Sequence, residues 1–281
     1  MSSESEAAPV RSRPAPKRPI VSTTTALQYP IATRSVLGVH IAVSNCAEVV
    51  ERSLAWAEAR QSRALFFAAV HMVMEAVDDP GFLALLNGAD MVNPDGMPVV
   101  WALRALGAGK AERVYGPDST VAMLSAAERA GVPVGFYGGT PQALESLLSA
   151  VRLRHPKLEI AFHESPPFRA ITADEDAAVV ERIAATGARL LFVGLGCPKQ
   201  ERWIMEHRGR VQAVMFGVGA AFDFLSGSKP QAPRWMMRFG LEWLFRFATE
   251  PRRLAMRYIK HNPRYVFKVL RQLLTGTPEG G

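Results

Sequence analysis

The sequence predicts an α/β protein with a mostly parallel sheet, helices on both faces of that sheet, and a C-terminal helical appendage. Short apolar runs that resemble buried strands alternate with stretches whose apolar residues have helical spacing. Such alternation is typical of a parallel sheet that is covered on both faces. Near Lys229 the composition changes, and aromatic residues then interleave with arginines. We therefore expect a disordered tail at 1–30, a sheet domain at 31–228 and a separate appendage at 229–281.

The expected strands are the apolar runs that end in glycine, proline or polar turn residues. They lie at 36–43, 64–70, 91–93, 132–137, 158–162, 190–193 and 211–216. The helices follow from apolar residues at i, i+3 and i+4. They lie at 46–60, 71–77, 80–87, 97–107, 119–130, 141–154 and 172–187. Thr140 before Pro141 predicts one helix start, and Thr172 with Glu175 forms the capping-box pattern of another.

Composition and charge limit the classes of function. With 281 residues, 48% of them apolar and 21% charged, the chain is globular. Cys46 and Cys197 lie far apart, so we expect neither a disulfide framework nor a zinc site, and a reducing cytoplasm is the default location. No apolar run reaches the roughly 18 to 20 residues that span a bilayer, and the N-terminus has no signal-peptide pattern.

The charge is concentrated at the C-terminal end. Residues 229–281 contain 11 Lys or Arg against three Asp or Glu, whereas residues 31–228 contain 18 against 21. A basic segment on a nearly neutral body indicates an anionic partner, which can be a phosphate, a nucleic acid or a membrane surface. Aromatic and basic residues alternate along 241–260, which fits either an interfacial helix on an anionic membrane or an amphipathic helix packed on the body. No nucleic-acid-binding motif accompanies the charge, so we expect no nucleic-acid partner.

Glycine-bearing turns follow three of the expected strands, at 138–141, 194–198 and 217–219. Glycine lets backbone amides approach a ligand, and the helix N-termini that follow favour anions, so several such turns on one sheet edge suit a nucleotide diphosphate. The alternative is that each glycine only makes a tight turn. Lys199 and Gln200, directly after one loop, are placed to donate to a sugar or phosphate, and Glu201 to accept from sugar hydroxyls or to complement the helix dipole.

Asp95 lies where a strand passes into a helix, within Asn93-Pro94-Asp95-Gly96. Working side chains in sheet proteins of this kind occupy such positions, but Asp is also a favoured helix cap. A second polar cluster at 113–118 ends the same segment. No Asp-x-Asp follows a strand, and His40, His71 and His163 share no metal-ligand spacing, so we expect no metal site.

Several motifs together resemble the WecG/TagA/CpsF glycosyltransferase family, over about residues 35–260. They are Pro94-Asp95-Gly96, the segment 112–118, Phe136-Tyr137-Gly138-Gly139, the segment 194–201, the segment 217–223, and Glu242-Trp243 with Arg246. The resemblance implies a Rossmann-like body and an inverting, metal-independent transfer without a cofactor. The donor would be a UDP-sugar and the acceptor a polyprenyl-diphosphate-linked glycan of cell-surface polysaccharide synthesis. The protein would then be cytoplasmic and peripheral on the inner face of the cell membrane.

The resemblance also implies roles for particular residues. Asp95 matches the proposed general base, and Gln200 matches a glutamine of the family site. Arg113 matches an arginine of that site and is the second catalytic candidate, which would stabilise the diphosphate together with the appendage arginines. The arginines that would engage the diphosphate are Arg246, Arg252, Arg253 and Arg257. The other substrate-binding candidates are His71, Asn93, Gly138, Gly139, Gly196, Lys199, Glu201 and Asp223. The chain departs from the family pattern at 69–71, where Thr-x-Asn is frequent, and at 231–233, where Arg-Ala-Pro is common.

Two other functions stay open at this point. A nicotinamide-dependent oxidoreductase would use a similar sheet, and a non-catalytic module would bind a nucleotide-sugar or an anionic lipid without transfer. Within the transferase hypothesis, the donor sugar can be N-acetylmannosamine, its uronic acid, glucose or glucuronic acid. The oligomeric state is also open, with a homo-oligomer among the options.

Overall fold

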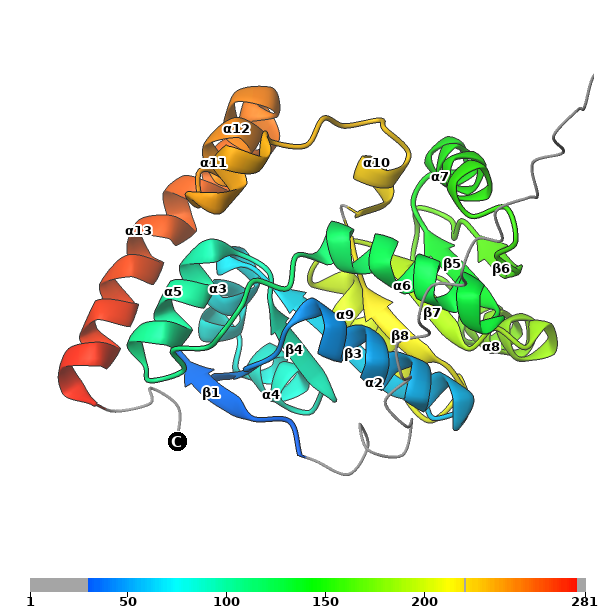
Figure 1. Cartoon of the computed structure of the whole chain (residues 1–281), viewed down its shortest axis with the longest axis horizontal. Coiled ribbons are helices and arrows are strands. Elements are labelled where there is room, and N and C mark those ends of the chain that lie inside the picture. Colours follow the sequence, from blue (N-terminus) through cyan, green and yellow to red (C-terminus); the bar gives the residue numbers. More distant parts are fainter. Residues whose placement is uncertain (1–29, 220, 277–281) are drawn as a thin grey trace, which may run out of the picture.

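The computed structural model describes residues 30–219 and 221–276, and of Arg253 only the backbone. The tail predicted at 1–30 therefore lies, except for Pro30, outside the described residues. Six strands form a sheet in the order β4-β3-β8-β7-β5-β6, and two more form a separate pair, β1-β2. The α/β class with helices on both faces and a C-terminal helical segment is confirmed (Figure 1).

All neighbouring strands of the large sheet are parallel. The strands are β3 (Arg63–Ala68), β4 (Met91–Pro94), β5 (Val134–Gly138), β6 (Ile160–Glu164), β7 (Leu190–Gly194) and β8 (Val214–Gly217). Because parallel strands point the same way, Asp95 and the three glycine turns come to one edge of the sheet. The strands in the middle are short and almost wholly apolar, as burial on both faces requires.

Helices cover both faces because side chains alternate along each strand. Leu65 and Phe67 face one core, while Phe66 between them faces the other. The first core is covered by α2 (Cys46–Glu58), α6 (Gly116–Ala130), α7 (Pro141–Arg154) and α10 (Ala221–Leu225). The second is covered by α3 (Val70–Asp78), α4 (Pro80–Asn87), α5 (Met97–Ala105), α8 (Ala173–Thr186) and α9 (Lys199–His207). The capping box of Thr172 and Glu175 is present.

The single strand predicted at 36–43 is wrong. The segment is a hairpin of β1 (Thr33–Val36) and β2 (Val39–Ala42) that turns at Leu37 and Gly38, with φ angles of 52° and 88°. Two-residue hairpin turns need such positive φ values, which glycine supplies easily and leucine does not. The apolar Leu37 makes the turn look like part of a strand in the sequence. Its side chain is only 2% exposed, which explains why an apolar residue occupies the turn.

The C-terminal segment forms α11 (Arg234–Arg238), α12 (Glu242–Thr249) and α13 (Pro251–Thr275). Figure 1 shows α13, in red, beside α5, with α11 and α12 above it. Polar contacts join α13 to the body along its length. Arg264 pairs with Asp78 at 2.5 Å, and Gln272 accepts from the Leu37 amide and donates to the Ser35 carbonyl, both at 3.0 Å. No helix in the described part of the chain has the length and apolarity that a membrane crossing requires.

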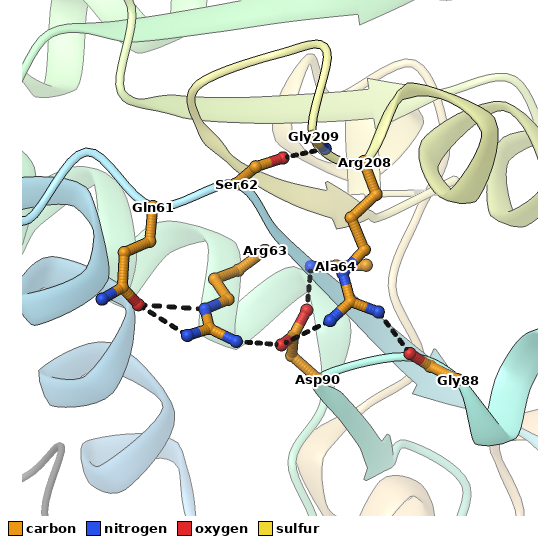
Figure 2. Close-up of polar contacts among 8 residues, drawn as sticks. All are labelled: Gln61, Ser62, Arg63, Ala64, Gly88, Asp90, Arg208 and Gly209. Atoms are coloured by element: carbon orange, nitrogen blue, oxygen red, sulfur yellow. Dashed lines mark hydrogen bonds and ion pairs between the residues drawn. The ribbon is translucent and has the colours of Figure 1, made fainter.

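At the amino edge of the sheet, Asp90 joins three segments (Figure 2). Its Oδ1 accepts from Arg63 at 2.6 Å and from Arg208 at 3.2 Å, and its Oδ2 accepts from the Ala64 amide at 2.9 Å. Arg208 also donates to the Gly88 carbonyl at 2.5 Å. The Asp90 side chain is only 6% exposed, and both of its oxygens are occupied. This cluster holds β3, β4 and the end of α9 together.

Candidate active site

A cavity of about 1590 Å³ opens at the carboxyl edge of the sheet. Its lining comes from the glycine turns after β5, β7 and β8, from the segment around Asp95, and from α5, α12 and α13. The appendage is therefore part of the cavity wall. Of the predicted site residues, those that line it are His71, Asp95, Arg113, Gly139, Gly196, Lys199, Gln200, Asp223, Arg246 and Arg257.

The Asp95 carboxyl is held by one hydrogen bond from the backbone. The Val114 amide donates to the Pro94 carbonyl at 2.8 Å, which extends the pairing beyond β4 and brings residues 113–116 alongside Asp95. The Gly116 amide, in the first turn of α6, donates to Asp95 Oδ1 at 2.7 Å. The helix that follows Asp95 in the chain, α5, has Gly96 as its cap and no side-chain cap bond. Asp95 is therefore not the cap of that helix.

The surroundings make Asp95 more basic than an ordinary aspartate. Its pKa is raised to about 6, mainly by burial and also by the charge of Glu242, although Arg113 and the Gly116 amide oppose the rise. Arg113 does not neutralise the carboxylate directly. Its Nε donates to the backbone carbonyl of Asp95, and its Nη2 donates to Glu242 Oε2 at 2.5 Å. A carboxylate with such a pKa is ionised at neutral pH and can accept a proton.

Arg113, Tyr115 and Glu242 form a polar cluster that links the appendage to the site. The guanidinium lies over the Tyr115 ring at 4.2 Å, and the Tyr115 hydroxyl donates to Glu242 Oε1 at 3.2 Å. The Arg113 and Glu242 side chains are 16% and 13% exposed. Sequence reasoning assigned no role to Tyr115 or Glu242. Both lie in motifs of the family resemblance, which was the available signal, but only the fold brings α12 to Arg113.

Two appendage arginines enter the cavity without a carboxylate partner. Within the described part of the chain, neither Arg246 nor Arg257 forms an ion pair, and Arg246 Nε is buried without a hydrogen-bond partner. Their charges, after burial as the largest cause, lower the pKa of His71 to about 3, so this imidazole is neutral at physiological pH. Partly buried cations without counterions favour an anionic ligand, because an unpaired buried charge is costly.

The glycine turns shape the cavity floor through close backbone approach. At Gly138, where φ is +127°, a Cβ atom would lie 2.5 Å from the Gly194 carbonyl oxygen. The Gly139 amide donates to the same oxygen at 3.1 Å, which joins the ends of β5 and β7. Gly138 itself does not line the cavity. For Gly138 the structure therefore gives a packing reason, and its contact with substrate stays a prediction.

Gln200 and Glu201 lie under these turns. Gln200 Oε1 accepts from the Gly196 amide at 3.1 Å, and Gln200 Nε2 donates to Glu201 Oε1 at 2.8 Å. Glu201 has no exposed surface and does not line the cavity, and burial raises its pKa to about 7. In this arrangement Glu201 supports Gln200, and Gln200 supports the 194–196 loop. Lys199, in contrast, is exposed at the cavity wall.

For the other predicted residues, the structure shows burial, ion pairing or a position away from the cavity. Asn93 is fully buried, accepting from the Ser44 hydroxyl at 2.9 Å and donating to the Phe66 carbonyl at 3.3 Å. Asp223 lines the cavity but is paired with Lys229 at 2.6 Å. Arg252 is exposed and does not line the cavity, and the Arg253 side chain lies outside the description. Substrate contacts of these four residues stay predictions.

The arrangement suits transfer chemistry that develops negative charge. A basic carboxylate and two unpaired guanidinium groups share one cavity. The carboxylate can therefore accept a proton from a bound substrate while the guanidinium groups stabilise an anion. Among residues 30–219 and 221–276, no group of three or more His, Cys, Asp or Glu side chains is arranged to hold a metal ion.

Known proteins resemble the chain over most of its length. The model of the WecG/TagA/CpsF glycosyl transferase family matches residues 34–279. An N-acetylglucosaminyldiphosphoundecaprenol N-acetyl-β-D-mannosaminyltransferase of Bacillus spizizenii is 33% identical over 198 residues, which are 70% of this chain and 74% of the relative. A protein of the same name from Staphylococcus aureus is 28% identical over 237 residues, 83% and 91% of the two chains. The chain therefore belongs to the WecG/TagA/CpsF family of glycosyl transferases.

Proposed function

We propose that this glycosyl transferase moves an N-acetylmannosamine-type sugar from a UDP-sugar to an N-acetylglucosamine carried on polyprenyl diphosphate. The observation that carries the proposal is the Asp95 carboxyl in the cavity. One of its oxygens is held by the Gly116 amide, and its pKa is raised to about 6, with Arg246 and Arg257 in the same cavity. The names of the relatives support this choice of donor sugar and acceptor.

In the proposed reaction, Asp95 takes the proton of the acceptor hydroxyl as that oxygen attacks the anomeric carbon. A positioned base contributes about 10²- to 10⁴-fold to such a step. The bond from the anomeric carbon to the diphosphate breaks on the opposite face, so the configuration inverts, and UDP leaves with additional negative charge. Arg246 stabilises that charge, and Arg257 is assigned to the diphosphate of the acceptor, so no metal ion is required for this.

Neutral His71 and the exposed Lys199 are the side chains that we assign to sugar and phosphate recognition. His71 has its pKa lowered to about 3, mainly by burial and then by Arg257, so it can donate or accept a hydrogen bond without adding charge. It stands where the family frequently has asparagine, which is also a neutral donor and acceptor. An uncharged partner at this position is consistent with a neutral sugar.

The test is UDP release in the presence of an N-acetylglucosaminyl diphospho-lipid acceptor, with UDP-N-acetylmannosamine, its uronic acid, UDP-glucose and UDP-glucuronic acid as donors. We expect release with UDP-N-acetylmannosamine only when the acceptor is present. A chain that is protected against thermal unfolding by NAD(P)H and releases no UDP with any donor would be an oxidoreductase. Binding of UDP-sugar without transfer would indicate a non-catalytic module.

We also propose that the appendage attaches the protein to the inner face of the cell membrane. Trp235 and Phe239 on and after α11 are 58% and 70% exposed, and the segment is strongly basic. Exposed aromatic residues beside basic ones bind anionic bilayer surfaces. Co-sedimentation with anionic vesicles should fall in Trp235→Glu and Phe239→Glu, whereas Phe168→Glu, changed at an 87% exposed phenylalanine of the body, should bind as the wild type does. Equal binding by all three variants and the wild type contradicts this attachment.

A further inference from the structure

The active-site cavity continues into an apolar groove between α5 and α13. The groove walls are Trp101 and Ala105 from α5 and Val266, Leu270 and Leu273 from α13. These side chains line the same cavity as Asp95 and Arg257, so groove and site are continuous. Figure 1 shows the two helices side by side, on the edge of the molecule away from β6.

Buried residues form the floor of the groove and fix its width. Ala102, Tyr265 and Val269 line the cavity and are at most 8% exposed. The Tyr265 hydroxyl donates to the Pro98 carbonyl at 3.2 Å, which holds α13 beside the first turn of α5. The groove is therefore a built feature of the fold, with a small side chain, Ala105, on the α5 side, where a larger one would narrow it.

The groove has cations at one end and apolar side chains along the rest of its length. The residues of α13 that line the groove form an apolar stripe of Val266, Leu270 and Leu273. Arg257 lies before this stripe, beside His71, and Leu273 lies sixteen residues further along α13, or about 24 Å at 1.5 Å per residue. The charged residues of α13 beyond Arg257 do not line the groove, and two of them, Lys260 and Arg264, pair with Asp78 instead. The lining thus passes from unpaired cations to hydrocarbon without an intervening charge.

Apolar side chains in this stripe are left in water. Val266 and Leu270 are 56% and 54% exposed although they line a cavity. A contiguous apolar surface of this kind favours an apolar ligand, since covering it removes hydrocarbon from water. The ligand that fits the whole lining has a diphosphate at one end and a hydrocarbon chain at the other.

We propose that the groove between α5 and α13 binds the isoprenoid chain of the acceptor, in the units that follow the diphosphate. This proposal rests on the proposed function, since it takes the diphosphate of the acceptor to lie against Arg257 on α13, while Arg246 on α12 is left for the leaving UDP. The groove then positions the acceptor sugar, because fixing the lipid and the diphosphate leaves the hydroxyl group within reach of Asp95. Binding energy from the tail thereby orients the reacting end.

The experiment measures binding to the full-length protein by calorimetry, without detergent, with farnesyl diphosphate and with inorganic diphosphate as probes. The wild type should bind farnesyl diphosphate at least about tenfold more tightly, because the tail removes apolar surface from water. Val266→Asp and Ala105→Phe should abolish this difference and leave the affinity for inorganic diphosphate unchanged. Phe267→Asp is the matched control, because Phe267 is adjacent, apolar and 68% exposed but does not line the groove. It should bind both probes as the wild type does.

Several results would overturn the proposal. Equal affinity of the wild type for both probes would exclude tail binding, as would equal effects of Val266→Asp and Phe267→Asp. If those two variants instead lose only vesicle binding, the stripe contacts the bilayer; if they change the mass in light scattering, it contacts a second copy. Should Val266→Asp fail to fold, Leu270→Asp replaces it, since Leu270 is also exposed and lines the groove. Tight farnesyl diphosphate binding without any sugar transfer would contradict the proposed function and leave the groove intact.

Discussion

Two aspartates flank β4, and they are used in opposite ways. Asp90, before the strand, accepts from Arg63, Arg208 and the Ala64 amide, so both of its oxygens are occupied. Asp95, after the strand, accepts from the Gly116 amide through Oδ1, and it lines the cavity. Arg113 lies near Asp95 but donates to its backbone carbonyl and to Glu242. The Arg113 guanidinium thus forms no hydrogen bond with the Asp95 carboxylate.

The difference shows that the two ends of one short strand carry different functions, a structural one at Asp90 and a chemical one at Asp95. At the amino edge a fully paired carboxylate connects β3, β4 and α9, and it gains from every partner. At the carboxyl edge a carboxylate is left partly unpaired and its pKa rises to about 6, mainly through burial. This arrangement costs stability, because the charged form is poorly solvated, but it retains basicity for a proton transfer.

The largest expected effect is the loss of kcat in the Asp95→Asn variant. We expect kcat to fall by about 10²- to 10⁴-fold, because the amide cannot accept the proton of the acceptor hydroxyl. UDP binding should be unchanged. The melting temperature at pH 8 should not fall, since the amide oxygen can still accept from the Gly116 amide and the cost of the poorly solvated charge disappears. Activity assays, UDP titration and thermal unfolding check these three points; near wild-type turnover would remove Asp95 from the mechanism.

Asp90→Asn should show the reverse pattern. The free energy of unfolding should fall by about 2 to 3 kcal/mol, because Arg63 and Arg208 lose a nearly buried charged partner. The kcat of the protein that remains folded should stay near the wild-type value. Urea unfolding and an assay well below the melting temperature separate the two quantities. A variant that keeps its stability but loses kcat would refute the structural role of Asp90.

Glu242→Gln sharpens the comparison at the active site itself. We expect kcat/KM to fall about tenfold, or about 1.4 kcal/mol, because Arg113 and Tyr115 lose the charge that positions them. The charge of Glu242 also raises the pKa of Asp95, so the acidic limb of the pH profile should move to lower pH. Unchanged activity together with an unchanged limb would mean that Glu242 only attaches α12.

The smallest effect is expected at Asp118, whose pair with Arg234 also joins the body to the appendage. The two side chains are 41% and 72% exposed, and their 2.5 Å ion pair is open to solvent. Exposed pairs contribute about 0 to 1 kcal/mol. Asp118→Asn should therefore change neither kcat/KM nor the melting temperature appreciably, which makes it the control for Glu242→Gln. A loss as large as that of Glu242→Gln would show that any appendage contact matters equally.

Periodicity and capping residues predict most of the fold. The parallel sheet, the Thr140 and Thr172 helix starts and the helical appendage all follow from local pattern and are present. The hairpin at Leu37 could not be predicted, because its turn is buried against α13 and carries an apolar residue.

Part of the geometry of the candidate site follows from the sequence. Asp95 and the glycine turns come together because parallel strands end at one edge, which the sequence pattern implies. The partners of Arg113 could not be predicted, since Glu242 is separated from it by more than a hundred residues and approaches only through the packing of the appendage. For Glu201 the sequence favours either a sugar contact or a helix-dipole role, and it does not show that the side chain is fully buried and accepts from Gln200.

The most direct test of the account is the pH dependence of single-turnover sugar transfer. With a raised pKa of about 6, Asp95 is protonated and inactive as a base below that pH and ionised above it. The rate should therefore rise about tenfold per pH unit up to about pH 6 and then level off. Asp90→Asn should keep this limb, and Asp95→Asn should lose it. A limb near the ordinary aspartate pKa, or one that persists in Asp95→Asn, would contradict the claim that Asp95 is the base.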